Sequence, residues 1–179
     1  MVYMSTRSYT AGVTEERWLD EGQHRAWLGY RRMRLLLDAR IARDLAEASG
    51  LSLADYDVLS TLGSAEDHRG RSTEIASRML WSKSRLSRQL ARMEQRGLVK
   101  REQCPADGRG SDIVLTDQGL ETITKAAPTH VESVRAHFID LLSSDQLRAL
   151  ADMAETVLSH LGDGTGAIPG RTSRGRARS

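Results

Sequence analysis

The chain has 179 residues, 39% of them hydrophobic and 28% charged, a composition typical of one soluble globular domain with helical extensions. No apolar run approaches the ~18 residues of a membrane span, and the polar N-terminus lacks a secretory signal. The single cysteine, Cys104, excludes an internal disulfide and a multi-cysteine zinc site. We therefore expect a cytoplasmic protein that starts at Met1 or Met4, and not a membrane protein, a secreted disulfide scaffold or a zinc finger.

The charge is unevenly distributed. The formal net charge is only +2, but residues 71–112 contain ten Lys and Arg against five Asp and Glu. Residues 164–179 add four Arg and no acid, so the remaining chain is net acidic. A basic middle and a basic tail on an acidic frame are typical of a module that binds a polyanion. Solvated surface charge is the alternative interpretation.

Residues 14–49 predict one long amphipathic helix. This stretch has no proline, and its apolar residues recur three, four or seven positions apart, on one helical face. They are Leu19, Ala26, Tyr30, Met33, Leu37, Ile41 and Leu45. Gly50 stands where a glycine commonly ends a helix. Because so long a helix exceeds what a compact globule needs, we expect it to pack against a partner chain.

Three shorter helices are expected next, separated by turns. They are predicted over 52–64, 72–79 and 82–97, with a polar loop over 64–70. Ser72 and Ser82 are suitable N-cap residues for the second and third of these helices. After residue 97 two β-leaning runs, 98–102 and 112–115, flank a turn-rich segment and predict a hairpin. Two short helices joined by a tight turn and followed by a hairpin indicate a winged helix-turn-helix.

Two helices are expected to close the fold. Thr116 can cap the first, over about 117–142, in which Pro128 predicts a bend or break. The second starts at Ser144 or Asp145 and carries the apolar stripe Leu147, Leu150, Met153, Val157 and Leu161. The expected fold class is mainly α with a small β-hairpin wing. The Gly-, Arg- and Ser-rich tail beyond residue 162 cannot bury a core, and we expect it to be disordered.

The helix over 82–97 has the pattern of a DNA-reading helix. Leu86, Leu90 and Met93 fall within about 60° of one another around its axis and predict a buried stripe. The opposite face carries Ser84, Arg85, Arg88, Arg92 and Gln95.

These exposed residues suit two kinds of contact with DNA. Arg88 can donate paired hydrogen bonds to a guanine in the major groove, and Ser84 and Gln95 can donate or accept. Lys83 and Arg92 lie nearer the edges and suit phosphates, whereas Arg85 suits either role. The alternative is an ordinary solvated basic face.

The tip of the predicted hairpin is a second candidate. Gly108 and Gly110 permit a sharp turn, so that Arg109 can project toward a narrow minor groove. Asp107 can brace this loop or pair with a nearby arginine. An exposed turn with a solvated arginine is the alternative.

Several motifs in order resemble the core of MarR-type regulators. They are Ser72-Thr73-Glu74-Ile75-Ala76, the run from Ser82 to Leu90, the run from Met93 to Val99, Asp107-Gly108-Arg109, and Leu115-Thr116-Asp117-Gln118-Gly119. The motifs cover about 50 residues, and the helical frame fits residues 14–162. The resemblance implies a homodimer whose terminal helices interlock, with one winged helix-turn-helix per subunit. It also implies a repressor that binds pseudo-palindromic promoter DNA and is released by a small ligand.

The resemblance also implies roles for particular residues. Ser84, Arg85 and Arg88 would face bases, and Arg109 would enter the minor groove. Trp81 departs from the family pattern, because many relatives have a smaller aliphatic residue there. It can fill the core at the turn or contact a phosphate. The full set of DNA-binding candidates is Ser82, Lys83, Ser84, Arg85, Ser87, Arg88, Arg92, Gln95, Asp107 and Arg109.

The sequence offers no catalytic or metal-binding constellation. It has no Gly-rich phosphate loop or nucleophile elbow, and its five histidines are scattered. We therefore expect no enzyme, no metal and no cofactor. The resemblance places an effector pocket between the dimer helices and the DNA-binding domain. Its candidates are His24, Trp27, Tyr30, Met33 and Tyr56, for which a role as core and interface side chains is the alternative.

The hypothesis is a sequence-specific, homodimeric regulator that binds double-stranded DNA, with a possible small-molecule effector. An architectural binder indifferent to sequence is the first alternative, and a helical enzyme or ligand-binding protein is the second. The expected organisation is a flexible N-terminus (1–13), a dimerisation helix (14–50), the DNA-binding domain (51–116), C-terminal dimerisation helices (117–162) and a basic tail (163–179).

Overall fold

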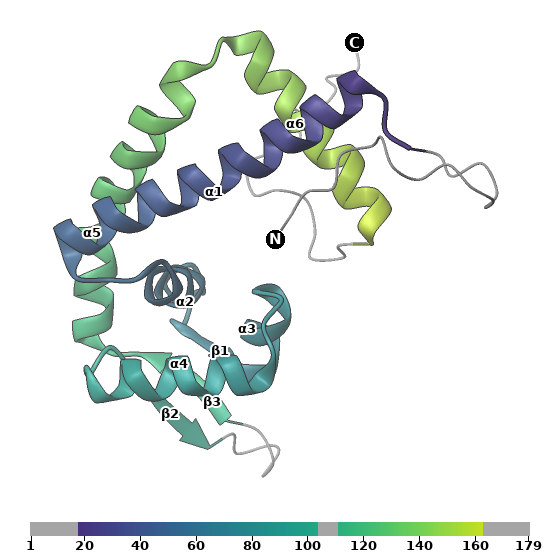
Figure 1. Cartoon of the computed structure of the whole chain (residues 1–179). Coiled ribbons are helices and arrows are strands. Elements are labelled where there is room, and N and C mark those ends of the chain that lie inside the picture. Colours follow the sequence, from purple (N-terminus) through teal and green to yellow (C-terminus); the bar gives the residue numbers. More distant parts are fainter. Residues whose placement is uncertain (1–17, 104–110, 163–179) are drawn as a thin grey trace, which may run out of the picture. The chain divides into compact units, whose positions relative to one another are not determined.

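The computed structural model describes residues 18–103 and 111–162, which form a mainly helical fold with one small sheet (Figure 1). The elements are α1 (Glu21–Ser49), α2 (Leu53–Gly63), β1 (Arg69–Arg71), α3 (Ser72–Arg78), α4 (Lys83–Gln95), β2 (Val99–Gln103), β3 (Ser111–Leu115), α5 (Asp117–His137), the 3-10 helix η1 (Ile139–Leu141) and α6 (Ser144–Leu161). The chain divides into two compact units, Met1–Leu36 and Leu37–Ser179. Within the described ranges, no helix has the length and apolarity needed to cross a membrane. The expected fold class is confirmed.

The sheet has three antiparallel strands in the order β1-β3-β2. Val99 of β2 pairs with Leu115 of β3, which confirms the predicted hairpin. The strand β1 was missed, because the segment 64–70 reads as a polar loop. Gly70 of β1 pairs with Ile113. The strand has only three residues, which are too few and too polar to show strand periodicity.

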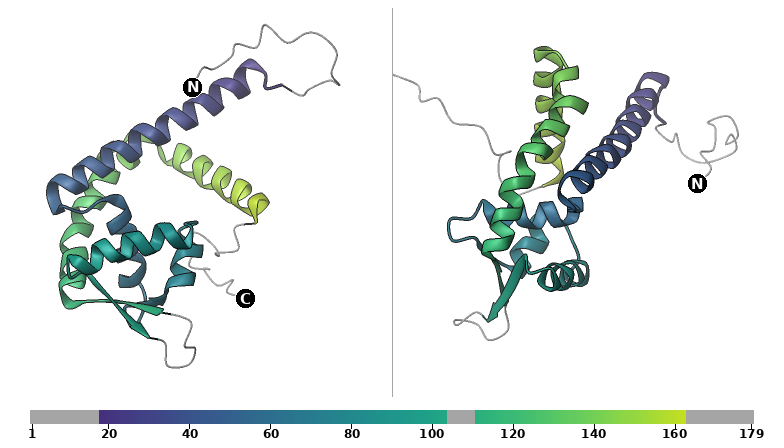
Figure 2. Two further views of the ribbon diagram at one scale, coloured as in Figure 1. Left: turned by 60° about the horizontal axis from the view of Figure 1, so that its bottom comes forward. Right: turned by 90° about the vertical axis from the view of Figure 1, so that its left-hand side faces the viewer.

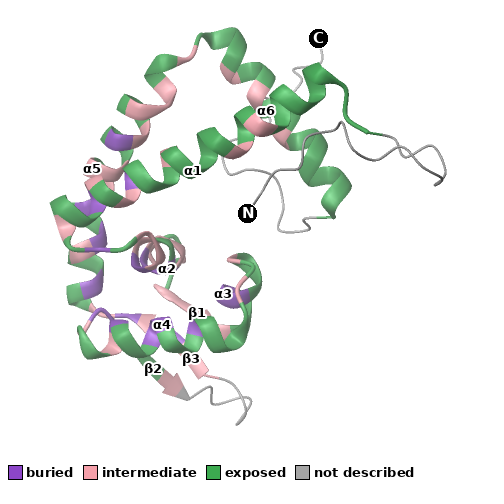
Figure 3. Cartoon of the chain, in the orientation of Figure 1, coloured by how far each residue is buried: buried purple, intermediate pink, exposed green. Residues whose placement is uncertain are grey.

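The core lies in the second unit, where α2, α4 and α5 pack around the sheet. Figure 3 shows buried residues gathered on the facing sides of these helices. The predicted stripe of α4 is confirmed, since Leu86, Leu90 and Met93 are at most 2% exposed. The largest fully buried side chains are Leu45, Leu51, Leu59, Leu62, Leu86, Leu90, Met93, Ile113 and Val58.

The ends of the helices confirm most of the predicted caps. Ser82 Oγ accepts from the Arg85 N–H (3.2 Å), and Thr116 Oγ1 accepts from the Gly119 N–H (2.9 Å). Gly50 follows α1 at φ +67°, the left-handed conformation that suits glycine. The prediction for Ser72 was wrong. Arg71 is the N-cap residue, because its pairing in β1 keeps it extended directly before the helix.

Two predicted helix bounds need correction. Helix α1 begins at Glu21, because Asp20 Oδ1 accepts from the Gln23 N–H (2.8 Å) and so caps the helix there. Residues 14–17 of the predicted helix lie outside the described ranges. Helix α5 continues unbroken through Pro128 and ends at His137, where Phe138 leaves the helical conformation at φ −143°. Buried Ile123, Ala126 and Ser133 on both sides of Pro128 pack this helix in place.

A polar cluster joins the C-terminal part of α1 to α5. Ser133 Oγ donates to Asp44 Oδ2 (2.7 Å), His137 Nε2 lies 2.9 Å from the same oxygen, and Arg40 Nε lies 2.9 Å from Asp44 Oδ1. The hydrogen bond from Ser133 is the largest of the effects that hold the pKa of Asp44 below its usual value. The ionised carboxylate is therefore the form that stabilises this joint.

In the Asp44→Asn variant, the free energy of unfolding should depend less on pH than in the parent. Because the folded pKa of Asp44 is depressed, its contribution is present above its ordinary pKa of 3.8 and is lost as the pH falls below that value. We expect the free energy of unfolding of the parent to exceed that of Asp44→Asn by a margin that shrinks as the pH falls through about 4. Urea unfolding at several pH values measures this. Ser133→Ala should reduce the same pH dependence, and a margin independent of pH would contradict the assignment.

Candidate nucleic-acid interface

Helix α4 presents a polar, basic face to solvent. Its apolar stripe fixes the helix on the core, and this leaves the opposite face exposed. The exposed polar residues of the helix are Lys83, Ser84, Arg85, Ser87, Arg88, Arg92 and Gln95, all of them predicted DNA-binding candidates. Arg88 makes no hydrogen bond or ion pair with the residues that the structure describes. Its five N–H donors are therefore available for a ligand.

The arginine at the start of α4 is differently placed. The guanidinium carbon of Arg85 lies 4.2 Å from the centroid of the Trp81 ring. Trp81 is half-buried and packs against the core, and its backbone N–H donates to the Ala76 carbonyl (2.8 Å). This placement agrees with Trp81 as core filler at the turn.

A hydrogen-bond network centred on the buried Asp55, which we call the Asp55 network, connects α4 to α2. Asp55 Oδ1 accepts from Gln89 Nε2 (2.6 Å), and Asp55 Oδ2 accepts from Arg96 (2.9 Å). Arg92 donates to Gln89 Oε1, so this predicted phosphate contact already has a partner within the protein. The sequence interpretation missed Asp55, Gln89 and Arg96. A signal existed for Gln89, which falls between Leu86 and Met93 on the buried face of the helix.

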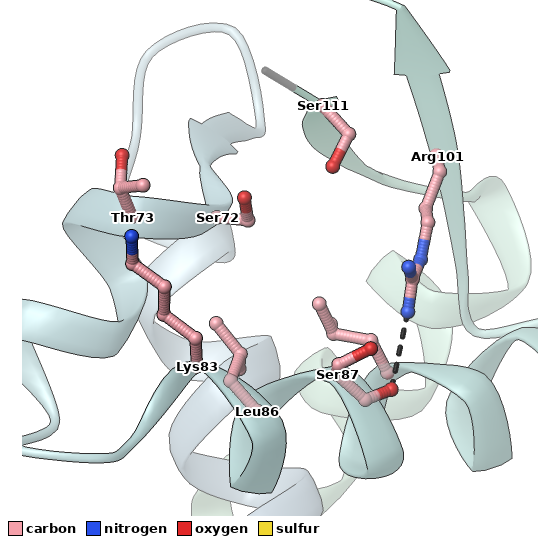
Figure 4. Close-up of a pocket in the computed structure, with 8 residues that line it drawn as sticks. Ser72, Thr73, Lys83, Leu86, Ser87, Arg101 and Ser111 are labelled. Carbon is pink, nitrogen blue, oxygen red and sulfur yellow. Dashed lines mark hydrogen bonds between the residues drawn. The ribbon is translucent and has the colours of Figure 1, made fainter. Parts of the chain in front are cut away.

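A pocket of about 180 Å³ opens between α3, α4 and the hairpin strands (Figure 4). It is lined by Ser72, Thr73, Lys83, Leu86, Ser87, Leu90, Arg101 and Ser111. The Lys83 amino group points toward Thr73, and Arg101 donates to the Ser87 carbonyl (3.1 Å) (Figure 4). Arg101 also pairs with Glu94 (3.0 Å). Lys83 and Arg101 lie on opposite sides of the pocket, and two cations with hydroxyls beside them can bind an oxyanion (Figure 4). Of the lining residues, only Lys83 and Ser87 were predicted DNA contacts.

The strands β2 and β3 extend away from the helices as a hairpin (Figure 2). Toward the loop end of this hairpin, Glu102 of β2 contacts Arg69 of β1 and Lys100 of β2, each at 2.7 Å. The hydrogen bond from Lys100 contributes most to lowering the pKa of Glu102. Asp107 and Arg109 lie outside the described residues, so their roles at the hairpin tip stay predictions.

The effector candidates fall in both units. His24, Trp27, Tyr30 and Met33 lie on α1 within the first unit, where the rings of Trp27 and Tyr30 stack with centroids 6.0 Å apart. Tyr56 lies on α2 in the second unit, with its ring centroid 4.1 Å from that of His130. The pocket that would join them stays a prediction.

The two histidines of α5, His130 and His137, have different surroundings. Burial is the main cause that lowers the pKa of His130, and no described residue bonds its buried Nδ1. His137 bonds Asp44. Within the described ranges, no cluster of three or more His, Cys, Asp or Glu side chains could hold a metal ion.

Comparison with known proteins identifies the family. The sequence model of the MarR family matches residues 49–110. The regulator PecS of Dickeya dadantii is 30% identical over 131 residues, which cover 69% of this chain and 76% of PecS. The crystal structure of AbsC, a MarR family regulator from Streptomyces coelicolor, superposes with a TM-score of 0.78 at 41% identity, covering 83% of this chain and 99% of AbsC.

A DNA complex is among the similar structures. Sco3205, a MarR family regulator from Streptomyces coelicolor solved in complex with DNA, superposes with a TM-score of 0.77 at 35% identity. The match covers 80% of this chain and 94% of Sco3205. These relatives are transcriptional regulators and not enzymes. The chain belongs to the MarR family and is a DNA-binding transcriptional regulator with a winged helix-turn-helix.

Proposed function

We propose that the chain is a ligand-responsive repressor that binds a pseudo-palindromic operator as a homodimer. The observation that carries the proposal is α4, whose apolar stripe is buried while its arginine-rich face is exposed. Two such helices about one DNA turn (~34–36 Å) apart would enter successive major grooves. In this proposal Arg88, Arg85, Ser84 and Gln95 meet base edges.

Phosphate contacts would come from the pocket between α4 and the hairpin. Lys83 and Ser87 of α4 line this pocket, and Arg101 reaches it from β2. The capping Ser82 lies directly before α4 and would add a further contact. Such contacts position a protein on the duplex without reading its sequence. Arg109 at the hairpin tip would add a minor-groove contact, and Asp107 would brace this loop or pair with a nearby arginine.

The dimer is supported by the apolar residues that α6 leaves uncovered. Met153, Val157 and Leu161 are 55–69% exposed, and no residue of this helix is buried (Figure 3). On α1, Trp27 and Tyr30 are about half exposed. Exposed apolar faces of this kind mark an interaction site, and we propose that a second copy of the chain covers them. An effector bound near His24, Trp27, Tyr30, Met33 and Tyr56 would act by favouring one spacing of the two α4 helices.

The decisive experiment measures binding to the DNA upstream of the protein's own gene and to a scrambled duplex, over a salt series. We expect affinity at least about 10³-fold higher for the upstream DNA, with a steep salt dependence. Light scattering should give twice the chain mass of 19.9 kDa. Equal and salt-sensitive binding to both duplexes would favour the architectural alternative, and no binding at low salt would exclude a DNA reader.

Arg88→Ala should lower specific affinity and relax base preference. Its guanidinium, which no described residue engages, can donate two hydrogen bonds to a guanine, and losing them should cost about 1–3 kcal/mol. Lys83→Ala is the control, because a phosphate contact should weaken binding equally on all sequences and reduce the salt slope by about 1. Electrophoretic mobility shifts with operator and single-base variants measure both. Unchanged base preference in Arg88→Ala would show that α4 reads DNA in another way.

A further inference from the structure

Trp81 is held rigidly at the turn between α3 and α4. Leu80, directly before it, has φ +53°, a left-handed conformation that is rare for a leucine. The backbone N–H of Trp81 donates to the Ala76 carbonyl (2.8 Å), and the half-buried side chain packs against the core. The backbone and the core therefore fix the position of the indole ring.

Arg85 lies one helical turn later, over this ring. Its backbone N–H is bonded to the capping Ser82, and its guanidinium carbon is 4.2 Å from the Trp81 ring centroid. This distance is well inside the ~6 Å range of a cation–π contact. Arg88, one turn further along the same face, has no such contact with any described residue. The two arginines of the proposed reading face are thus held very differently.

We infer that Trp81 is a positioning residue for DNA recognition: its indole face holds the Arg85 guanidinium in place and so sets the base preference at the pair that Arg85 reads. This inference rests on the proposed function. Stacking uses the face of the guanidinium and leaves its N–H donors at the edge free for a guanine. The ring also restricts the Arg85 side chain before DNA binds, so that Arg85 loses less rotamer freedom on binding.

The test compares four variants: Trp81→Leu, Trp81→Phe, Arg85→Ala and the double variant Trp81→Leu/Arg85→Ala. Single-base-pair variants of the operator first locate the pair at which Arg85→Ala loses its preference. At that pair, we expect Trp81→Leu to reduce the preference about tenfold, and Trp81→Phe, which keeps an aromatic face, to retain most of it. In the double variant, Trp81→Leu should add nothing to the effect of Arg85→Ala.

The preference at the pair read by Arg88 is the matched control, and Trp81→Leu should leave it unchanged. A general loss of folding would weaken binding to all duplexes alike and lower the thermal midpoint, with no selective change at the Arg85 pair, which separates it from the specific effect. The inference is overturned if Trp81→Leu keeps the parent preference at the Arg85 pair, or if it weakens all duplexes equally. A parent that binds operator and scrambled DNA equally would instead overturn the proposed function.

A second readout needs no DNA. The ring current of an indole face shifts the NMR signals of a stacked arginine side chain upfield. We expect upfield-shifted Arg85 side-chain resonances in the free parent and in Trp81→Phe, and their return to ordinary positions in Trp81→Leu. Ordinary Arg85 shifts in the parent would remove the stacking on which the inference depends.

Discussion

Replacing Asp55 by alanine is expected to lower the free energy of unfolding by about 3 kcal/mol. Asp55 is only 5% exposed, and its carboxylate accepts four hydrogen bonds. Alanine leaves buried Gln89 Nε2 without its acceptor and removes the capping box of α2. The loss stays below that of a fully buried ion pair, because the Arg96 side chain is 43% exposed and can turn to water.

The same variant should weaken specific DNA binding. The Asp55 network holds the second half of α4 against the start of α2, and Arg96 also donates to the Gly50 carbonyl (3.1 Å). Without the carboxylate, α4 loses a polar tie that fixes its orientation on the core. Urea unfolding gives the stability, and operator binding by the fully folded protein gives the functional effect.

Arg96→Ala is the matched control for Asp55→Ala. It removes one of the four hydrogen bonds to the carboxylate and leaves those from Gln89 and Ser52, so we expect a loss of about 1 kcal/mol. Asp55→Asn keeps the size of the side chain but removes its charge, and it should fall between the two. Equal stability of Asp55→Ala and the parent would show that the network contributes little to holding α4.

The sequence predicted the parts of the fold that depend on local pattern. The stripe of Leu86, Leu90 and Met93 follows from helical periodicity, and the cap at Ser82 from residue type and spacing. Two β-leaning runs around a turn-rich segment were enough to predict the hairpin. Each of these features is encoded by residues that are close together in the sequence.

What the sequence could not predict depends on pairs far apart in the chain. Asp55 and Arg96 are 41 residues apart, and no local pattern connects them. The strand β1 exists only because its residues find partners in β3, and that pairing displaced the predicted cap at Ser72. Arg101 escaped notice because it lies on a strand, whereas the predicted site followed the face of a helix.

The stacking of Arg85 on Trp81 joins two neighbouring residues, but the local pattern did not predict it. The spacing of four residues was visible in the sequence, but Trp81 precedes the helix and follows a left-handed residue, Leu80, so helical periodicity does not place its ring against Arg85. From residue type alone, two roles of Trp81 were possible: it could fill the core at the turn or contact a phosphate. Its contact with Arg85 was not among those alternatives.

Gly119→Ala is expected to lower the free energy of unfolding by about 3 kcal/mol. A Cβ atom at this position would lie 2.0 Å from the Leu98 carbonyl oxygen, and a backbone atom cannot move aside as a flexible side chain does. The first turn of α5 would have to separate from the end of the helix-turn-helix. Glycine normally weakens a helix relative to alanine, so its presence here follows from the close approach of two backbones.

Gly63→Ala is the matched control, because its Cβ would make an ordinary 3.8 Å contact with Ile123 Cγ2. That variant should equal or slightly exceed the stability of the parent in urea unfolding. A Gly119→Ala protein as stable as the Gly63→Ala protein would contradict the close packing at Leu98.

The contact at Gly119 also connects stability with DNA recognition. Thr116 Oγ1 donates to the Gly97 carbonyl (2.6 Å), and Gln118 Nε2 donates to the Arg96 carbonyl (3.2 Å), so α5 starts directly on the segment that follows α4. Any displacement of α5 at this point therefore moves the end of the proposed reading helix. We expect Gly119→Ala to lose operator affinity even under conditions where it remains folded, while Gly63→Ala keeps it.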